Sequence, residues 1–207
     1  DLEAEAAIRT VLAEHAPGDA IVGEEGDDEA GTTGRRWIVD PLDGTVNYLY
    51  GIPMWAVSVA CEGRAGIVLD PVRGEAFTAV AGEGAWLNGE PLAPADVSDL
   101  GMALTATGFG YDSERRALQA EIAARALPRV RDLRRAGAAA LDLAWCAAGR
   151  LDAYWERGVN LWDVAAGELI CREAGRTVVR LDESPPLPWG VLAAAPGVAE
   201  DLLGLVS

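Results

Sequence analysis

Residues 37–45 read Trp37-Ile38-Val39-Asp40-Pro41-Leu42-Asp43-Gly44-Thr45, and they join a short apolar run to two carboxylates and a Gly-Thr pair. β-Branched and aromatic residues suit a packed sheet, so the apolar run predicts a buried strand. Pro41 lacks the N–H that a strand needs, and we expect the strand to end there. Asp40 and Asp43 would then lie at the carboxyl end of a strand, where open α/β sheets bind ligands. Two carboxylates this close repel each other unless a cation or a shared proton intervenes, which favours a metal site.

Two further acidic positions stand at the ends of predicted elements. Residues 20–23 predict a strand that runs into Glu24-Glu25, and if this strand is the parallel neighbour of residues 37–39, the acidic ends share one sheet edge. Residues 160–175 have the apolar spacing of a helix that Gly175 caps, with Asp163 in the first turn, where the helix dipole favours a carboxylate. These hard oxygen donors without His or Cys suit Mg²⁺ rather than zinc.

Each of these acidic residues also has an ordinary structural interpretation. Asp163 could cap its helix, Asp43 could form an Asx turn before Gly44, and Glu24 could be a solvated strand end. The metal hypothesis is preferred because all the carboxylates adjoin apolar runs, where a purely solvated carboxylate is unusual.

Gly44-Thr45 precedes residues 46–50, which predict a short helix. The first N–H groups of a helix are free to bind an anion, and a glycine has no Cβ to block its approach. Carboxylates for a metal beside such an anion site indicate phosphate chemistry. Hydrolysis there needs a metal-activated water and charge neutralisation, but no nucleophilic side chain.

Composition excludes several other classes of function. The chain has 207 residues with 33 acidic and 17 basic ones, a net charge of −16, and all the basic residues are Arg. Such an acidic surface disfavours binding of nucleic acid or anionic lipid, and the absence of Lys excludes Schiff-base chemistry. The one His, His15, is interpreted as a surface or capping residue. Cys61, Cys146 and Cys171 are widely spaced in apolar contexts, so we expect buried free thiols and a cytoplasmic location.

The remaining sequence predicts one α+β domain over residues 1–207, without repeats or a linker. The Gly-rich polar segment 26–34 is expected to be a mobile flap over the site. Helices are expected at residues 2–15, 112–127, 141–148 and 198–205, besides 160–175. Strands are expected in an antiparallel meander at 55–61, 65–69 and 75–80 with a hairpin signal at 86–89, and then at 102–107, 153–156, 177–179 and 191–194.

The sequence resembles the inositol monophosphatase family of Mg²⁺-dependent, lithium-sensitive phosphatases. Three signatures of the family are matched in order and spacing by Gly23-Glu24-Glu25, by residues 37–45 and by residues 161–167, which read Leu-Trp-Asp-Val-Ala-Ala-Gly. The resemblance covers nearly the whole chain and implies a layered αβαβα sandwich of the sugar-phosphatase type in a homodimeric enzyme. Members of the family usually carry a longer N-terminal segment, so an N-terminal helix region is expected to be missing here.

The resemblance also implies roles for residues at the matching positions. It implies two or three Mg²⁺ ions, and it implies that Glu24 and Thr45 orient the attacking water, with Asp43 as a further catalytic residue. The N–H groups of Gly44 and Thr45 would hold the phosphate. The implied metal ligands are Glu24, Asp40, the carbonyl of Leu42, Asp43 and Asp163, while Asp1 and Glu25 would assist a third ion.

Substrate choice depends on Glu156, seven residues before Asp163. At this position, inositol phosphatases of the family have a carboxylate that accepts hydroxyl groups of the sugar. Asp43, Gly137 and Ala139 match positions at which those enzymes contact the sugar ring. The competing interpretation pairs Glu156 with Arg150 or Arg157 at the surface.

The favoured reaction is that of a phosphoric monoester hydrolase, which converts inositol 1-phosphate to myo-inositol and phosphate. Relatives in the family act on histidinol phosphate, fructose 1,6-bisphosphate and phosphoadenosine phosphate, and these stay alternatives. The non-enzymatic alternatives are a catalytically idle metal-binding regulatory protein and a purely structural acidic domain.

Overall fold

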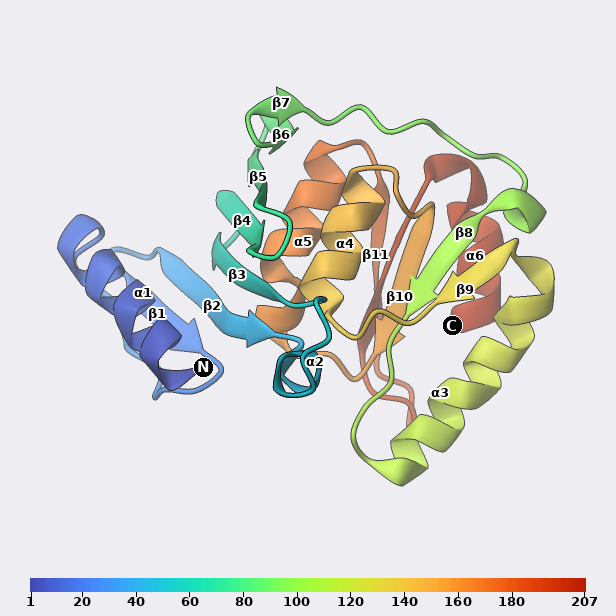
Figure 1. The fold of residues 1–207 in the computed structure, drawn as a ribbon, viewed down its shortest axis with the longest axis horizontal. Helices are drawn as coiled ribbons and strands as arrows, with labels where there is room; N and C mark the ends of the chain where they lie inside the picture. Colours follow the sequence, from blue (N-terminus) through green and yellow to red (C-terminus); the bar gives the residue numbers. More distant parts are fainter.

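The computed structural model describes residues 1–207, which form six α-helices and two β-sheets (Figure 1). The helices are α1 (Leu2–His15), α2 (Thr45–Leu49), α3 (Ser113–Ala126), α4 (Ala139–Ala147), α5 (Leu161–Glu173) and α6 (Ala199–Val206). All the helices predicted from apolar spacing are present, with ends that differ by one or two residues. None of the six is both long enough and apolar enough to span a bilayer.

The first sheet has seven strands that follow one another in sequence order. They are β1 (Ala20–Gly23), β2 (Arg36–Asp43), β3 (Ala56–Cys61), β4 (Ala65–Asp70), β5 (Glu75–Val80), β6 (Gly84–Leu87) and β7 (Glu90–Pro91). β1 and β2 are parallel, and every later pair is antiparallel. The predicted meander is therefore confirmed, because short turns join its alternating strands.

The second sheet has five strands in the order β11 (Thr177–Leu181), β12 (Gly190–Ala194), β10 (Ala153–Arg157), β8 (Leu104–Thr107) and β9 (Asp132–Arg134). β10 runs antiparallel to β12 but parallel to β8. The sequence did not predict β9, whose three residues Asp-Leu-Arg lack an apolar run and pair only with β8.

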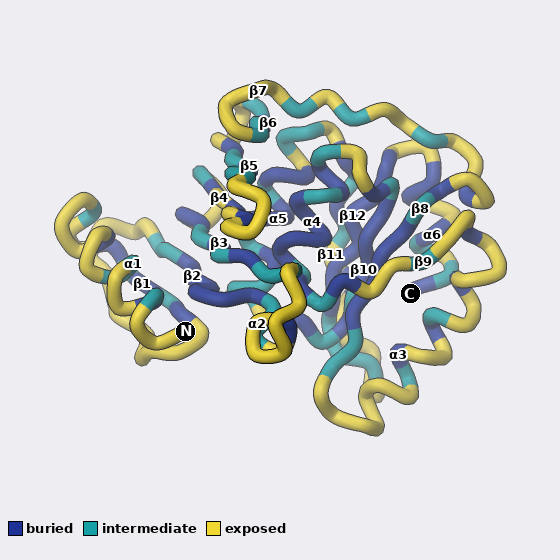
Figure 2. The backbone as a smooth tube through the Cα atoms, in the orientation of Figure 1, coloured by how far each residue is buried: buried dark blue, intermediate teal, exposed yellow.

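The elements stack in five layers, which confirms the predicted αβαβα sandwich (Figure 1). α1 packs on the first sheet, α4 and α5 fill the space between the sheets, and α3 and α6 cover the outer face of the second sheet. α4 is almost wholly buried and α5 is mostly buried or half-buried, whereas α1 and α2 expose much of their surface (Figure 2). The largest apolar cluster joins α4 and α5 to both sheets, so the central layer connects the rest of the fold.

The prediction that Pro41 ends its strand is wrong. β2 continues to Asp43, but its register against β3 shifts between Asp40, which is opposite Ser58, and Asp43, which is opposite Ala56. A bulge leaves residues without ladder partners, and a proline is accommodated there because its missing N–H is not needed. The bulge gives the segment from Asp40 to Asp43 its irregular course.

Candidate active site

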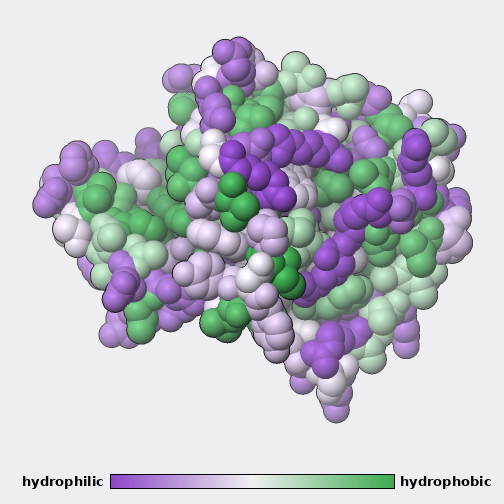
Figure 3. Space-filling view, in the orientation of Figure 1, coloured by the Kyte–Doolittle hydropathy of each residue, from purple (hydrophilic) through white to green (hydrophobic).

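A polar cavity of about 230 Å³ lies where several elements end. Residues of its wall follow β1 and β8, belong to the bulge of β2, or begin α2, α4 and α5. Figure 3 shows a hydrophilic band over β9 and the segment that leads from it to α4. Of the residues proposed from sequence, the cavity is lined by Glu24, Asp40, Leu42, Asp43, Gly44, Thr45, Gly137, Ala139, Glu156 and Asp163.

Parallel pairing of β1 with β2 brings the first two carboxylates together. Gly23 lies opposite Val39 in the register, and the N–H of Glu24 donates to the Val39 carbonyl at 3.3 Å. Glu24, which directly follows β1, and Asp40, at the start of the bulge in β2, therefore lie on neighbouring strands, and the predicted parallel pairing is confirmed. Asp40 is buried, whereas Glu24 is exposed on its outer side while it lines the cavity.

The bulge gives the two Asp residues of β2 different partners. Oδ1 of Asp40 accepts the N–H of Leu42 at 3.0 Å. Asp43 instead reaches across to α4, where its two oxygens accept the N–H groups of Ala139 at 3.1 Å and Ala140 at 2.7 Å. The proposed Asx turn at Asp43 is not formed, because this carboxylate binds the free N–H groups at the start of α4.

Asp163 both caps α5 and lines the cavity. Its Oδ2 accepts the N–H of Asn160, the residue before the helix, at 2.6 Å. The capping interpretation is thus correct, but it does not exclude a functional one, since the carboxylate also belongs to the cavity wall. The start of α5 holds this side chain more than a hundred residues from Asp40 in sequence and close to it in space.

The cavity destabilises the charged form of its four carboxylates, because they are buried and repel one another. Burial and the repulsion of neighbouring carboxylates raise the pKa of Asp40 to about 10 and that of Asp43 to about 8. Burial raises the pKa of Asp163 to about 6, and burial together with repulsion by Asp163 also raises the pKa of Glu24. Arg115 and Arg135 line the same cavity, but neither forms an ion pair with any of these four carboxylates, so the repulsion among them is not relieved by a direct cationic partner.

The four carboxylates have the chemistry of a Mg²⁺ site. Buried carboxylates without a cationic partner and with only oxygen donors match the chemistry of a hard divalent cation. No three acidic, His or Cys side chains are already arranged closely enough to enclose an ion. The donor atoms of these residues therefore fit Mg²⁺ in their chemistry.

Gly44 and Thr45 form the entry to α2. Gly44 has φ +92°, in the left-handed region, and an added Cβ would lie 3.0 Å from the Met54 carbonyl oxygen, so glycine is required. The hydroxyl of Thr45 donates to the Leu42 carbonyl at 3.0 Å. Both residues face the cavity beside the carboxylates.

A buried residue of α1, which the sequence did not suggest, supports the turn that carries Glu24. Glu5 accepts the N–H groups of Glu25 and Gly26, each at 2.9 Å, and Nε of Arg9 at 2.7 Å. An added Cβ on Gly23 would overlap the Glu5 carboxylate, which explains the glycine before Glu24. The turn after Glu24 therefore folds around the carboxylate of Glu5. The sequence did not predict this contact, because a single Glu in an Ala-rich helix is not distinguishable from an ordinary exposed residue.

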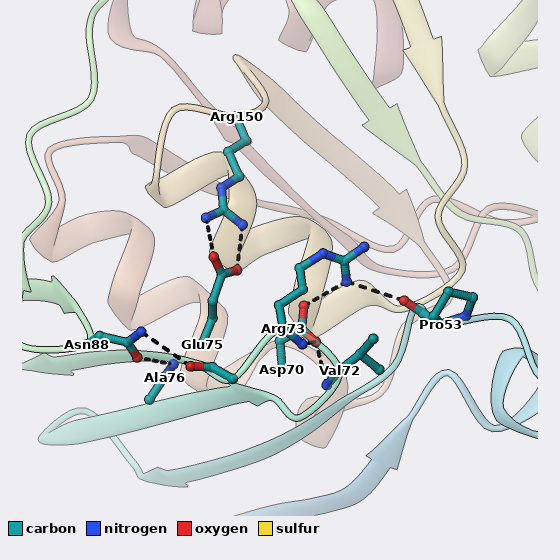
Figure 4. Close-up of polar contacts among 9 residues, drawn as sticks. Pro53, Asp70, Val72, Arg73, Glu75, Ala76, Asn88 and Arg150 are labelled. Atoms are coloured by element: carbon teal, nitrogen blue, oxygen red, sulfur yellow. Dashed lines mark hydrogen bonds and ion pairs between the residues drawn. The ribbon is translucent and has the colours of Figure 1, made fainter.

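Glu156 points into the cavity and not toward the surface arginines. Tyr154 donates its hydroxyl to Oε2 of Glu156 at 2.7 Å, and burial raises the pKa of Glu156 to about 7. Arg150 instead makes two bonds of 2.6 Å to Glu75, as Figure 4 shows beside the Asp70–Arg73 pair. Arg157 donates only to carbonyl oxygens. The surface-pairing interpretation of Glu156 is therefore wrong.

Two predicted residues lie outside the cavity wall. Asp1 is exposed at the start of α1, and the side chain of Glu25 is exposed on the turn that Glu5 holds. The cavity wall also contains residues that sequence patterns did not single out. They are Gly108, Phe109, Gly110, Tyr111, Arg115, Arg135, Asp142, Gly158, Val159 and Asn160. Most of these residues lie in loops that carry no recognisable sequence pattern. Only the folded structure shows that they line the same cavity.

Comparisons with known proteins identify the family. The model of the inositol monophosphatase family matches residues 1–206. The chain is 46% identical over 220 residues to "Inositol-1-monophosphatase SuhB" of Mycobacterium tuberculosis H37Rv, across 98% of this chain and 75% of that protein. It is 40% identical over 214 residues to "Nus factor SuhB" of Pasteurella multocida Pm70, across 100% of this chain and 80% of the relative.

A solved structure agrees with these sequence relationships. The inositol monophosphatase from Anabaena (Nostoc) sp. PCC 7120 superposes with a TM-score of 0.90 at 33% identity, over 99% of this chain and 84% of that one. Family model, relatives and structure all extend over nearly the whole chain. The chain belongs to the inositol monophosphatase family.

Proposed function

We propose that the chain is a Mg²⁺-dependent phosphomonoester hydrolase that acts on inositol 1-phosphate. One observation carries the proposal: Glu24, Asp40, Asp43 and Asp163 line one cavity beside Gly44 and Thr45, and none of the four carboxylates forms an ion pair with an arginine. Membership of the family supports phosphatase activity in general.

The metal ligands in this proposal are Glu24, Asp40, the carbonyl of Leu42, Asp43 and Asp163. Two or three Mg²⁺ ions would be bound, the third with help from Asp1 and Glu25. Bound Mg²⁺ supplies neutralising charge at the phosphate and lowers the pKa of water. The Glu5 bonds to the turn after Glu24, and the α4 bonds to Asp43, limit the motion of two of the ligands.

The other residues bind and orient the reactants. Glu24 and Thr45 orient the attacking water; the Thr45 hydroxyl is fixed by its bond to Leu42, which leaves its oxygen lone pairs available as acceptors. The N–H groups of Gly44 and Thr45 bind phosphate oxygens, and Gly44 allows close approach. Asp43 serves both the metal and the substrate, since its fixed carboxylate stands between the bulge and the start of α4.

Further substrate contacts come from β10 and from the segment that leads into α4. Glu156 accepts hydroxyls, because a carboxylate has acceptor sites for two vicinal O–H groups. Gly137 and Ala139 contact the ring through their backbone. The relative from Mycobacterium tuberculosis is named an inositol-1-monophosphatase, which supports inositol 1-phosphate for this chain.

The test is release of inorganic phosphate from a panel of substrates, with and without Mg²⁺ and Li⁺. The panel contains inositol 1-phosphate, histidinol phosphate, fructose 1,6-bisphosphate and phosphoadenosine phosphate. We expect Mg²⁺-dependent release, inhibition by Li⁺ and the highest kcat/KM for inositol 1-phosphate. Absence of Mg²⁺-dependent release from every substrate would refute the proposal.

A second candidate is a non-catalytic role, which the name "Nus factor" of the Pasteurella multocida relative favours. The complete set of cavity carboxylates argues for catalysis, because an idle protein has no need to bury uncompensated charge. Homodimer formation is a further part of the proposal, and sedimentation equilibrium measures it directly. The cytoplasmic location also stays a prediction; the three cysteines are buried and unpaired.

A further inference from the structure

Four exposed arginines lie close together in a chain that is otherwise acidic. Residues 129–135 contain four arginines and one aspartate, a net charge of +3, whereas the whole chain has a net charge of −16. The arginines lie at the end of the short 3₁₀ turn η2 (Leu127–Arg129), on β9 and on the residues that flank β9. We call them the arginine strip, which consists of Arg129, Arg131, Arg134 and Arg135.

One end of the arginine strip lies at the cavity that contains the four carboxylates. Arg135 and Gly137 line the cavity wall, whereas the other three arginines lie outside it. The hydrophilic band of Figure 3 follows β9 and the segment that leads from it to α4. Six residues of extended chain span at most about 20 Å, so the strip runs outward from the cavity over no more than this distance.

Most of the positive charge of the strip is not neutralised within the chain. Arg134 pairs with Asp132 at 2.7 Å, but the other three arginines form no ion pair with a carboxylate. The guanidinium of Arg135 donates to the Phe109 carbonyl at 3.4 Å, a contact that leaves its charge in place. Arginines keep their charge at all ordinary pH values, so the strip is a permanent positive surface beside the cavity.

The position of β9 offers a structural explanation for part of this pattern. β9 is the last strand of its sheet, and charged side chains on an edge strand prevent pairing with another chain. Charges of either sign have this effect. Protection of an edge therefore does not explain why the exposed charges of this segment are nearly all positive in a chain with an excess of acidic residues.

We propose that the arginine strip attracts the phosphate group of the substrate toward the cavity. This inference rests on the proposed phosphatase function and adds to it a surface outside the cavity. A phosphomonoester carries a charge of about −1.5 to −2 at pH 7, so the acidic surface of the chain repels it. The strip provides a local field of the opposite sign. Because Arg129 and Arg131 lie outside the cavity wall, they act on the approach of the substrate and not on the hydrolytic step.

Steady-state assays of Arg131→Glu with inositol 1-phosphate and constant Mg²⁺ test the strip. At most about 14 Å of extended chain separates residue 131 from Arg135. At an ionic strength of about 0.01 M, where the Debye length is about 30 Å, kcat/KM should fall about fourfold. At about 0.15 M the Debye length is about 8 Å, and the fall should be less than about twofold. The value of kcat should stay that of the wild type at both ionic strengths.

Two further variants serve as controls. Arg131→Lys keeps the charge and should keep the wild-type kcat/KM. Arg64→Glu makes the same change of charge at an exposed arginine without an ion pair, in the turn between β3 and β4 of the first sheet. It should change kcat/KM much less than Arg131→Glu does. Equal effects of the two reversals would show that only the net charge of the chain matters, and would overturn the inference.

A wild-type kcat/KM for Arg131→Glu at low ionic strength would also overturn the inference, as would a fall that is equally large at both ionic strengths. Sedimentation of the same variants tests the edge-protection role. A changed association state together with a wild-type kcat/KM would assign the strip to contacts between chains, against the inference.

Calorimetry with inorganic phosphate and Mg²⁺ gives a measurement that needs no turnover. At an ionic strength of about 0.01 M, the Kd should be about fourfold higher for Arg131→Glu than for the wild type. Failure of the wild type to release phosphate from inositol 1-phosphate would refute the proposed function. The Kd comparison would still decide the role of the strip, because an unchanged Kd would overturn it.

Discussion

Replacing Glu5 by alanine tests how the turn that carries Glu24 is held. The carboxylate accepts two backbone N–H groups at 2.9 Å and Nε of Arg9 at 2.7 Å, and its side chain is 3% exposed. Hydrogen bonds to a charged group contribute about 1.5–3 kcal/mol each. The freed N–H groups of this exposed turn can bond to water, so the expected loss in free energy of unfolding is about 2–3 kcal/mol and not the full sum.

Urea unfolding of Glu5→Ala and of Glu14→Ala measures this loss. Glu14 lies on the same helix but is exposed, so its replacement should change stability by less than about 0.5 kcal/mol. Because Glu25 follows Glu24 directly, Glu5→Ala should also raise the Mg²⁺ concentration that gives half-maximal activity. Wild-type stability together with a wild-type Mg²⁺ requirement would refute the role assigned to Glu5.

Three other substitutions test separate parts of the structure. The hydrogen bond from Arg35 is the main cause that lowers the pKa of Asp19 from 3.8 to about 2, so the stability it provides is present above about pH 4 and is lost as the pH falls toward 2. Urea unfolding should show Asp19→Asn less stable than the wild type at pH 7, with a difference that shrinks in acid; a constant difference would contradict the assignment. In Gly108→Ala, the new Cβ would overlap the Glu156 carboxylate, so the KM for inositol 1-phosphate should rise about tenfold in steady-state assays, and an unchanged KM would count against Glu156 as a substrate residue. Leu143→Ala removes a fully buried side chain between α4 and α5 and should cost about 3–5 kcal/mol in urea unfolding; a cost below about 1 kcal/mol would contradict the central packing.

Apolar periodicity predicted most of the fold because most elements bury one regular face. α1 and α5 were expected over nearly their observed ranges, and the meander followed from alternating residues between tight turns. β9 was missed, since three residues of mixed polarity carry no pattern and pair only through β8. The continuation of β2 through Pro41 was also missed, because a bulge depends on the partner strand and not on local sequence.

The candidate site was predicted where its residues adjoin recognisable elements. Glu24, Asp40, Asp43 and Asp163 follow apolar runs, and all of them line one cavity. The contacts that support them were not predictable. The bonds of Asp43 to α4 and the wrapping of a turn around Glu5 join segments far apart in sequence, and only the packed chain brings those segments together.

Asp142 is another residue of the cavity wall that could not be predicted from the sequence. In sequence it is one polar residue in the first turn of an apolar helix, where a carboxylate is ordinary because it favours the helix dipole. Its unpartnered oxygen and its place in the cavity wall appear only in three dimensions. The sequence therefore predicted the carboxylates at strand ends more completely than the wall that faces the substrate.

Mg²⁺-dependent hydrolysis of inositol 1-phosphate by Asp40→Asn and Asp163→Asn tests the central claim most directly. Each substitution keeps the size of the side chain and removes one carboxylate from the unbalanced cluster. Phosphate release should fall more than about 100-fold in both variants, while circular dichroism shows an intact fold. Near-normal turnover in either folded variant would contradict the assignment of these carboxylates to a catalytic metal site.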